Sequence, residues 1–189
     1  MKNQRIVTIF DTETTGFPSN KGLEAQPHLV QIAAIQFVGD RAVRHTSAIV
    51  NNGVDIPEQA SNVHGITTKF AELHGVRPVQ ALIPFIDMIE ASEAAIAFNT
   101  SFDLKIVNAA IQRFMPGTKD FNSRKIQKLC CMNSAIEVVK KPGRYSGYGW
   151  PKQIETYKFL FGDDADFNAH DAMDDVRACA RIYFELIKR

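Results

Sequence analysis

Two acidic residues separated by one position follow the first apolar run of this 189-residue chain: Asp11 and Glu13 come directly after Ile6 to Phe10. Side chains alternate between the two faces of a β-strand, so residues two apart point to the same side. Two carboxylates held close together are unfavourable unless they share a proton or bind a cation. An Asp-x-Glu pair is also common on solvated strand ends, so this pair alone does not establish a metal site.

A third carboxylate, Asp103, falls within a predicted helix over Ser101 to Phe114. At about 100° per residue, Asp103 lies in the apolar sector of that helix. A buried carboxylate needs a hydrogen-bond or metal partner, although Asp103 could instead interact with free amides at the helix N-terminus. If the preceding strand, Ala94 to Phe98, runs beside the first one, Asp103 can approach Asp11 and Glu13.

The segment from His170 to Asp175 offers a histidine and three carboxylates. On a helix predicted from Asp171 to Ile187, Asp175 borders the apolar stripe, Asp174 lies opposite it, and Asp171 is intermediate. We therefore expect Asp175 to face the body of the domain. His170 precedes the helix and is a general-base candidate, although a lone histidine is more often an ordinary surface or core residue.

The elements that position these residues indicate an α/β fold, a mixed sheet flanked by helices. Three early antiparallel strands are expected, followed by parallel strands separated by helices. The predicted strands are Arg5 to Phe10, Leu29 to Val38, Ala42 to Val50, Ala94 to Phe98 and Ile126 to Cys130. The predicted helices are Pro57 to Val63, Thr67 to Leu73, Val79 to Glu90 with a kink at Pro84, Ser101 to Phe114, Lys152 to Leu160 and Asp171 to Ile187.

Length and composition fit one globular domain over residues 1–189, with 45% hydrophobic and 23% charged residues. Three cysteines without a Cys-x-x-Cys motif indicate neither a disulfide framework nor a zinc site, and favour a cytoplasmic location. No signal peptide or membrane span is expected. From Arg113 to Lys152, nine lysines and arginines stand against two acids, a balance of +7 in a chain of net charge +1. This stretch is either a solvated basic face or a surface for a polyanion.

The motifs DTE at 11–13, NTSFD at 99–103 and HDAMDD at 170–175 resemble the three motifs of the DnaQ-like 3′→5′ exonucleases, the DEDDh branch of the ribonuclease H-like superfamily. The third motif of that branch reads His-x-Ala-x-x-Asp, which selects His170 and Asp175. The resemblance spans nearly the whole chain and includes HGIT at 64–67. It implies a ribonuclease H-like fold. The chain departs from many relatives at Cys130-Cys131-Met132, where Asp-Thr is frequent.

The resemblance implies that four carboxylates, Asp11, Glu13, Asp103 and Asp175, hold two Mg²⁺ ions, for which Mn²⁺ can substitute. His170 would take the proton of the attacking water, and a nucleoside 5′-monophosphate would leave a DNA 3′ end, most often of single-stranded DNA. Such an enzyme would serve proofreading, repair or end trimming. A polymerase or another protein is a possible partner.

The same resemblance suggests that a second set of residues contacts the terminal nucleotide. These are Thr14, Thr15, His64, Asn99 and Phe102. Separately, the loop PGRYSGYGWP at 142–151 combines cations with aromatic rings, as single-strand-binding surfaces do, although it could equally be an ordinary mobile loop. Two alternatives stay open: an RNA 3′→5′ exonuclease on the same scaffold, and a non-catalytic nucleic-acid-binding module.

Overall fold

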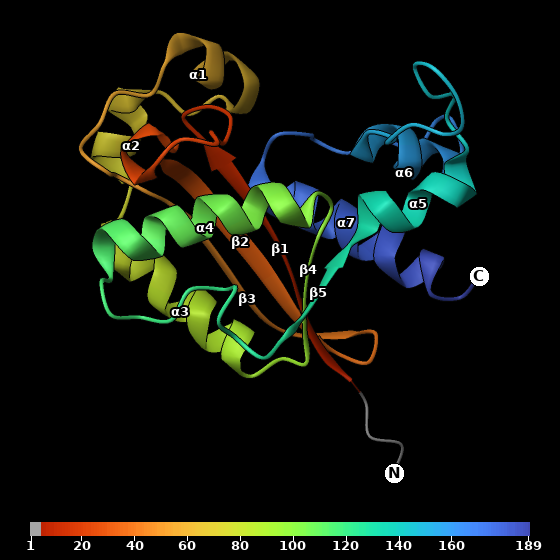
Figure 1. The fold of residues 1–189 in the computed structure, drawn as a ribbon, viewed down its shortest axis with the longest axis horizontal. Helices are drawn as coiled ribbons and strands as arrows, with labels where there is room; N and C mark the ends of the chain where they lie inside the picture. Colours follow the sequence, from red (N-terminus) through yellow and green to blue (C-terminus); the bar gives the residue numbers. More distant parts are fainter. Residues whose placement is uncertain (1–4) are drawn as a thin grey trace.

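A five-stranded sheet forms the centre of the molecule (Figure 1). The structure is a computed structural model that describes residues 5–189. The strands are β1 (Ile6–Thr14), β2 (Leu29–Val38), β3 (Arg41–Ile49), β4 (Ala94–Ala97) and β5 (Gln127–Cys130). Their order across the sheet is β3-β2-β1-β4-β5. The first three strands pair antiparallel, whereas β1 with β4 and β4 with β5 pair parallel, which confirms the predicted mixed sheet.

Seven α-helices and one short 3₁₀ helix surround the sheet in the described part of the chain (Figure 1). They are η1 (Leu23–Ala25), α1 (Glu58–His64), α2 (Thr68–His74), α3 (Pro78–Glu90), α4 (Thr100–Phe114), α5 (Cys131–Val139), α6 (Gln153–Phe161) and α7 (Ala172–Leu186). Among residues 5–189, no helix is both long and apolar enough to cross a membrane.

Two apolar clusters lie on opposite faces of the sheet. On one face, Phe10 of β1 packs with side chains of α3 and α4. On the other face, Val7 and Ile9 of β1 pack with side chains of α5, α6 and α7. Neighbouring residues of β1 therefore point to opposite layers, as the pleat of a strand requires. Odd-numbered positions of β1 face α7.

The structure differs from the prediction in the length of the first strand and in one additional helix. The first strand continues to Thr14 instead of ending at Phe10, because Asp11 and Glu13 pair with β2 opposite Ala33 and Gln31. The helix α5 was not predicted at all. Its apolar residues are spaced three or four apart, but it begins directly after β5 with no intervening turn to mark a boundary. The helix predicted through Pro84 is confirmed, because α3 runs from Pro78 to Glu90 and contains this residue.

Candidate active site

The carboxylates of Asp11 and Glu13 occupy odd positions of β1 and so share the face that packs against α7. Both residues are partly buried. A register shift follows Glu13 in the pairing of β1 with β2, so regular pairing ends immediately after the acidic pair. This placement confirms that the two carboxylates lie on one side of the sheet, inside the strand instead of beyond it.

Asp103 lies in the first turn of α4 and is buried, as its apolar sector predicted. The hydroxyl of Thr12 on β1 donates a hydrogen bond of 2.8 Å to Asp103 Oδ1. Parallel pairing of β4 with β1 brings the start of α4 to the same edge as the end of β1. Thr12, which the sequence did not single out, therefore links the Asp103 carboxylate to the strand that carries the acidic pair.

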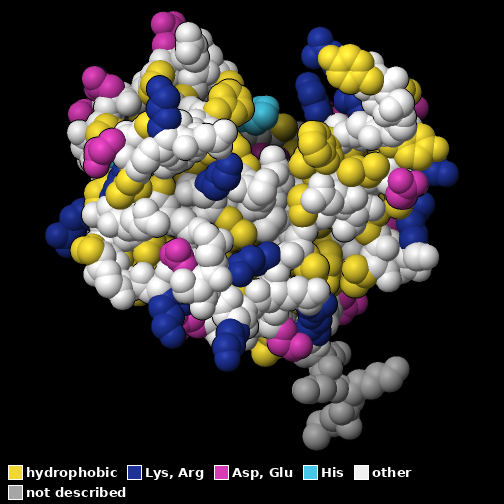
Figure 2. All heavy atoms as spheres, viewed as in Figure 1, with side chains coloured by type: hydrophobic (Ala, Val, Ile, Leu, Met, Phe, Trp, Pro, Cys, Tyr) yellow, Lys and Arg dark blue, Asp and Glu magenta, His cyan; other side chains and the backbone are white. Residues whose placement is uncertain are grey.

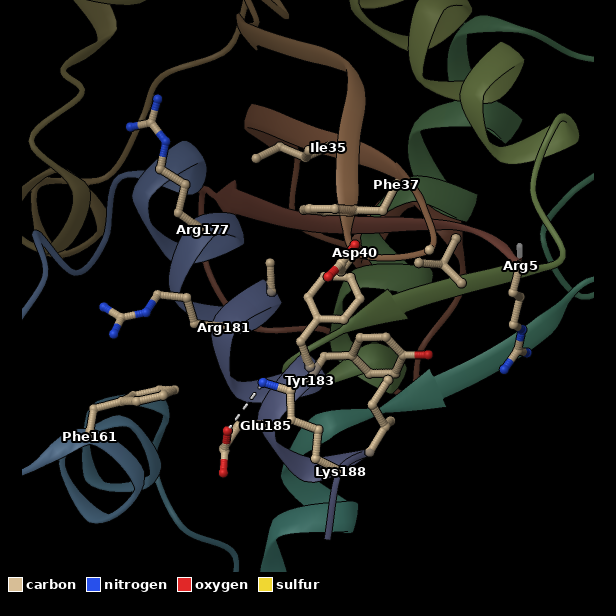
Figure 3. Close-up of a pocket in the computed structure, with 15 residues that line it drawn as sticks. Arg5, Ile35, Phe37, Asp40, Phe161, Arg177, Arg181, Tyr183, Glu185 and Lys188 are labelled. Carbon is tan, nitrogen blue, oxygen red and sulfur yellow. Dashed lines mark ion pairs between the residues drawn. The ribbon is translucent and has the colours of Figure 1, made fainter. Parts of the chain in front are cut away.

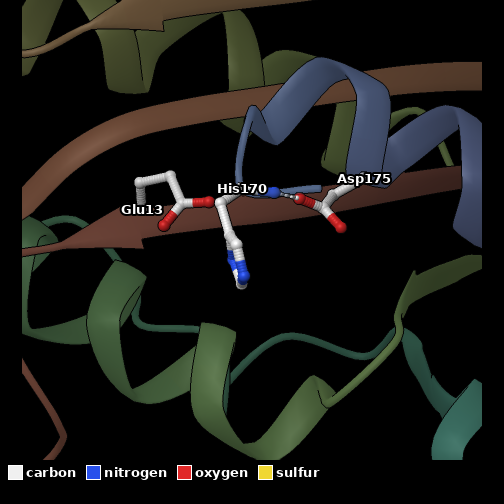
Figure 4. Close-up of side chains that lie close together, drawn as sticks. All are labelled: Glu13, His170 and Asp175. Atoms are coloured by element: carbon white, nitrogen blue, oxygen red, sulfur yellow. Dashed lines mark hydrogen bonds between the residues drawn. The ribbon is translucent and has the colours of Figure 1, made fainter. Parts of the chain in front are cut away.

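The start of α7 brings His170 and Asp175 toward Glu13 (Figure 4). A ligand-type atom from each of these three side chains lies within 4.8 Å of the other two. The His170 backbone has φ of 70°, which L residues rarely adopt, and its amide donates a 2.7 Å hydrogen bond to Asp175 Oδ2. Asp174 instead pairs with Arg177 on the outer side at 2.8 Å, so the helical wheel assigned the two aspartates correctly.

A set of hydrogen bonds ties the start of α7 to β2. Asp171 is the N-cap of α7, and its Oδ1 accepts from the amides of Met173 (3.0 Å) and Asp174 (3.2 Å). The buried Gln31 donates to Asp171 Oδ2 and accepts from the Ala172 amide, each at 3.2 Å. Because Gln31 is the pairing partner of Glu13 on β2, these bonds fix the distance between Glu13 and α7.

One cavity of about 810 Å³ is lined by all ten residues that the sequence singled out. A nucleotide-sized ligand fits a cavity in this range. Figure 2 shows the molecule hollowed between two lobes, with a histidine side chain in the notch. The lining residues predicted from sequence are Asp11, Glu13, Thr14, Thr15, His64, Asn99, Phe102, Asp103, His170 and Asp175.

The expected nucleotide-contact residues already have partners inside the protein. Thr14 Oγ1 donates to the Gly16 carbonyl at 2.6 Å, and Thr15 Oγ1 accepts from the His28 amide at 2.8 Å. His64 Nδ1 accepts from the Ile66 amide at 3.1 Å, and burial lowers the pKa of His64. These bonds orient the three side chains along the cavity wall.

Asn99 and Phe102 lie where β4 passes into α4. Asn99 is the residue before the helix, and its backbone carbonyl accepts from the Phe102 amide at 2.9 Å. Its side-chain oxygen accepts from Ser101 Oγ at 3.1 Å. The Phe102 ring packs against the α3 and α4 core and meets the ring of Phe17 edge-on, with centroids 6.4 Å apart.

The carboxylates raise one another's proton affinity. Burial and the charges of the other acids raise the pKa of Glu13 to about 8, and they raise the pKa of Asp11 well above its ordinary value. Burial raises the pKa of Asp103 to about 7, against the opposing hydrogen bond from Thr12. Burial also raises the pKa of Asp175 to about 6, against the His170 amide. Such a cluster is stabilised by protons or by a cation.

The donor set fits hard divalent cations. Four carboxylates converge on one cavity and offer oxygen ligands, which Mg²⁺ and Mn²⁺ prefer. Burial and the neighbouring negative charges raise the pKa values of Asp11 and Glu13, and a bound cation would offset both effects. The residues present therefore fit a divalent metal site.

A second cavity of about 820 Å³ lies beside the C-terminal half of α7 (Figure 3). Its lining is aromatic and aliphatic, with basic side chains around it. Arg181 lies 4.4 Å over the Phe161 ring and donates to the hydroxyl of Tyr157, and Lys188 pairs with Glu185 at 3.7 Å. In this second cavity, cationic side chains pair with acids or lie over aromatic rings, whereas the first cavity gathers four carboxylates.

Comparison with known proteins finds relatives among exonucleases. The family model described as exonuclease, RNase T type, matches residues 8–183. The DNA polymerase III subunit epsilon of Rickettsia typhi is 25% identical over 181 residues, covering 94% of this chain and 72% of that protein. The uncharacterized exonuclease CP81 of Escherichia phage 186 is 24% identical over 199 residues, covering 100% of this chain and 90% of that protein.

Solved structures share the fold. Exonuclease I of E. coli in complex with a dA16 oligonucleotide aligns with a TM-score of 0.75 at 15% identity, covering 98% of this chain and 41% of that one. A zinc-bound complex of the same enzyme with single-stranded DNA gives 0.73 at 18% identity, covering 98% and 40%. This chain thus spans about two fifths of the exonuclease I chains. Together with the family match, these findings confirm the DnaQ-like resemblance: the protein belongs to the RNase T exonuclease family, a family of nucleases that depend on divalent metal ions.

Proposed function

We propose that this protein is a 3′→5′ exonuclease of the DEDDh type that releases nucleoside 5′-monophosphates from DNA 3′ ends. The observation that carries the proposal is the convergence of four carboxylates and one histidine on a cavity of about 810 Å³. A binding module would have no chemical need for this combination. The E. coli exonuclease I complex with a dA16 oligonucleotide, which has the same fold, supports single-stranded DNA as the substrate.

The four acidic residues are the proposed metal ligands. Asp11, Glu13, Asp103 and Asp175 would hold two divalent cations, Mg²⁺ with Mn²⁺ as a substitute. When bound, the two cations stabilise charge on the phosphate and lower the pKa of the attacking water. The Thr12 hydrogen bond keeps one oxygen of Asp103 fixed in direction. The Asp175 oxygen that accepts from the His170 amide is likewise fixed, so the other oxygen of Asp175 is left to face the cavity.

His170 is the proposed general base. Its side chain is exposed and lies within reach of Glu13 and Asp175, while its backbone is held by Asp175 (Figure 4). An imidazole is the side chain that most often transfers protons in enzymes. A ring held by its backbone alone can turn toward a water in the cavity and take the proton as the water attacks phosphorus.

The enzyme would act in the cytoplasm on single-stranded 3′ ends. The polymerase III epsilon subunits among its relatives support a DNA polymerase as a further partner.

The test is cleavage of matched 5′-labelled single-stranded DNA, duplex DNA with a 3′ overhang, and single-stranded RNA, in Mg²⁺ or in EDTA. We expect stepwise shortening of the DNA from its 3′ end in Mg²⁺ and none in EDTA. If the RNA were shortened faster than the DNA, RNA would be the preferred substrate instead of DNA. No shortening of any substrate in Mg²⁺ or Mn²⁺ would contradict the proposal and favour a binding module.

A further inference from the structure

We propose that Trp150 and the loop from Pro142 to Pro151 form a stacking platform for single-stranded DNA that leads into the acidic cavity. The inference rests on the exonuclease function proposed above and names the surface that binds the single strand next to its terminal nucleotide. The loop joins α5 to α6 and lies outside the acidic cluster. Its last residues, Trp150 and Pro151, nevertheless line the same cavity as Glu13 and His170.

The loop has a defined backbone. Pro142 and Tyr148 form an isolated antiparallel bridge, and the Gly143 amide donates to the Gly147 carbonyl at 2.9 Å. A Cβ at Gly143 would lie 2.8 Å from the Ser146 carbonyl oxygen, so the tight closure requires glycine there. This turn holds the loop's side chains outward.

The aromatic rings of the loop are exposed to solvent. Trp150 is 67% exposed, Tyr145 89% and Tyr148 46%. Burying large aromatic surface is favourable, so three exposed rings on one short loop indicate a ligand surface. Figure 2 shows hydrophobic rings together with basic side chains on one wall of the notch.

Positive charge accompanies the rings. Lys140 Nζ lies 5.8 Å from the centre of the Tyr148 ring, and Arg144 Cζ lies 5.5 Å from that of Tyr145. The segment from Lys140 to Lys152 contains four basic residues and no acid, and one of the four, Lys141, pairs with Glu155 of α6 at 2.7 Å. A phosphate chain approaching the carboxylates of the cavity meets like charge there, and this segment supplies the opposite charge beside it.

Cations interleaved with exposed rings bind single-stranded nucleic acid by pairing with phosphates and stacking on bases. Bases in a duplex are stacked on one another and are not free to lie on a protein ring. The platform therefore selects for a single-stranded segment next to the terminal nucleotide.

Trp150 is the only tryptophan of the chain, so its fluorescence reports on this surface alone. We expect titration with dT10 in EDTA and low salt to quench the fluorescence, and a blunt duplex of equal length to need at least about tenfold higher concentration for the same quenching. Absence of quenching, or equal quenching by both DNAs, would overturn the platform.

Kinetics with Trp150→Ala provide the second test. We expect KM for dT10 to rise about tenfold with kcat unchanged, because one base loses its stacking surface. Trp150 also lines the cavity that the p-nitrophenyl ester of thymidine 5′-monophosphate would occupy, but the ester has no second base to stack, so its hydrolysis should fall by a clearly smaller factor than that of dT10. The matched control is Phe159→Ala, because Phe159 is 52% exposed on α6 and lies outside the cavity lining.

The outcomes separate the two proposals. If Trp150→Ala and Phe159→Ala behave alike on dT10, or if Trp150→Ala slows the ester and dT10 equally, the platform is wrong. If the wild-type protein cleaves no DNA but dT10 still quenches Trp150, the platform is supported and the proposed exonuclease function is contradicted.

Discussion

Two cavities of nearly equal volume lie along α7, about 810 Å³ beside its first turn and about 820 Å³ beside its C-terminal half. In the first, four carboxylates line one cavity, and burial and mutual repulsion raise their pKa values. In the second, cations lie on aromatic rings or pair with acids. Volume therefore does not distinguish the two cavities, whereas the gathering of like charge does, and it marks the first cavity as the proposed active site.

The largest expected difference between the cavities concerns catalysis. Asp175→Ala removes a proposed metal ligand and should lower kcat by more than about 100-fold, since even outer hydrogen-bond partners of metal ligands contribute 10–100-fold. The measurement is the rate of 3′ shortening of labelled single-stranded DNA in Mg²⁺, with circular dichroism to verify folding.

The matched control for Asp175→Ala is its neighbour. Asp174 pairs with Arg177 on the outer side of α7, so Asp174→Ala should keep the rate within about twofold. If Asp174→Ala abolished cleavage and Asp175→Ala did not, both the helical wheel and the motif register would be wrong.

A smaller effect on activity is expected for Gln31, which bonds to the start of α7 but does not line the acidic cavity. Gln31→Ala removes both hydrogen bonds from β2 to the start of α7 and should lower kcat about tenfold while raising the Mg²⁺ concentration needed for half-maximal rate. Steady-state rates over a Mg²⁺ titration measure both quantities.

The control for Gln31 lies on the same strand. Gln36 is also buried, but its Nε2 donates to the Met88 carbonyl of α3 at 2.8 Å, away from the acidic cavity. Gln36→Ala should lower the melting temperature without changing the Mg²⁺ requirement. Equal shifts in the Mg²⁺ requirement for both variants would contradict a positioning role for Gln31.

Much of this arrangement could be predicted from sequence, because periodicity reports which face a side chain occupies. It placed Asp103 and Asp175 toward the core, and Asp11 with Glu13 on one face. Gln31 could not be found in this way, since its partner Asp171 lies 140 residues away and the bond depends on the packed sheet. Periodicity carries no information on such contacts.

The ends of elements were harder to predict for a related reason. A polar stretch such as DTET reads as the end of a strand, yet pairing with β2 extends β1 through it. The partner strand supplies the hydrogen bonds that local propensity does not anticipate.

The raised pKa values predict a pH dependence of stability without metal. The folded protein binds protons at Glu13 and Asp103 more tightly than the unfolded chain does, so stability falls as pH rises from about 4 toward about 8. In EDTA, the melting temperature should therefore fall between pH 5 and pH 8, measured by scanning calorimetry.

Divalent ions should oppose this loss. Added Mg²⁺ or Mn²⁺ neutralises the carboxylates, so the melting temperature should rise more at pH 8 than at pH 5. Glu13→Gln removes one of the repelling charges and should flatten the EDTA profile. A profile that rises with pH would show that the acids are already neutralised by the protein.

The smallest effect on activity is expected at the second cavity. Arg181→Ala removes a cation from the Tyr157 and Phe161 rings and should lower the free energy of unfolding by about 1 kcal/mol. The rate of DNA shortening should stay within about twofold. A large loss of activity with an unchanged melting temperature would give the second cavity a catalytic role and weaken the contrast with the first.

The alternation of side chains along β1 limits which mutations in its coding sequence can be tolerated. The odd positions of β1 carry Asp11 and Glu13, while its even positions carry Phe10 and Thr12 toward α3 and α4. Removing one residue upstream within the strand would turn the acids into the layer of α3 and α4 and Phe10 into the layer of α7. The strand should therefore tolerate a volume-conserving substitution at one of its buried apolar positions better than the insertion or deletion of a single codon.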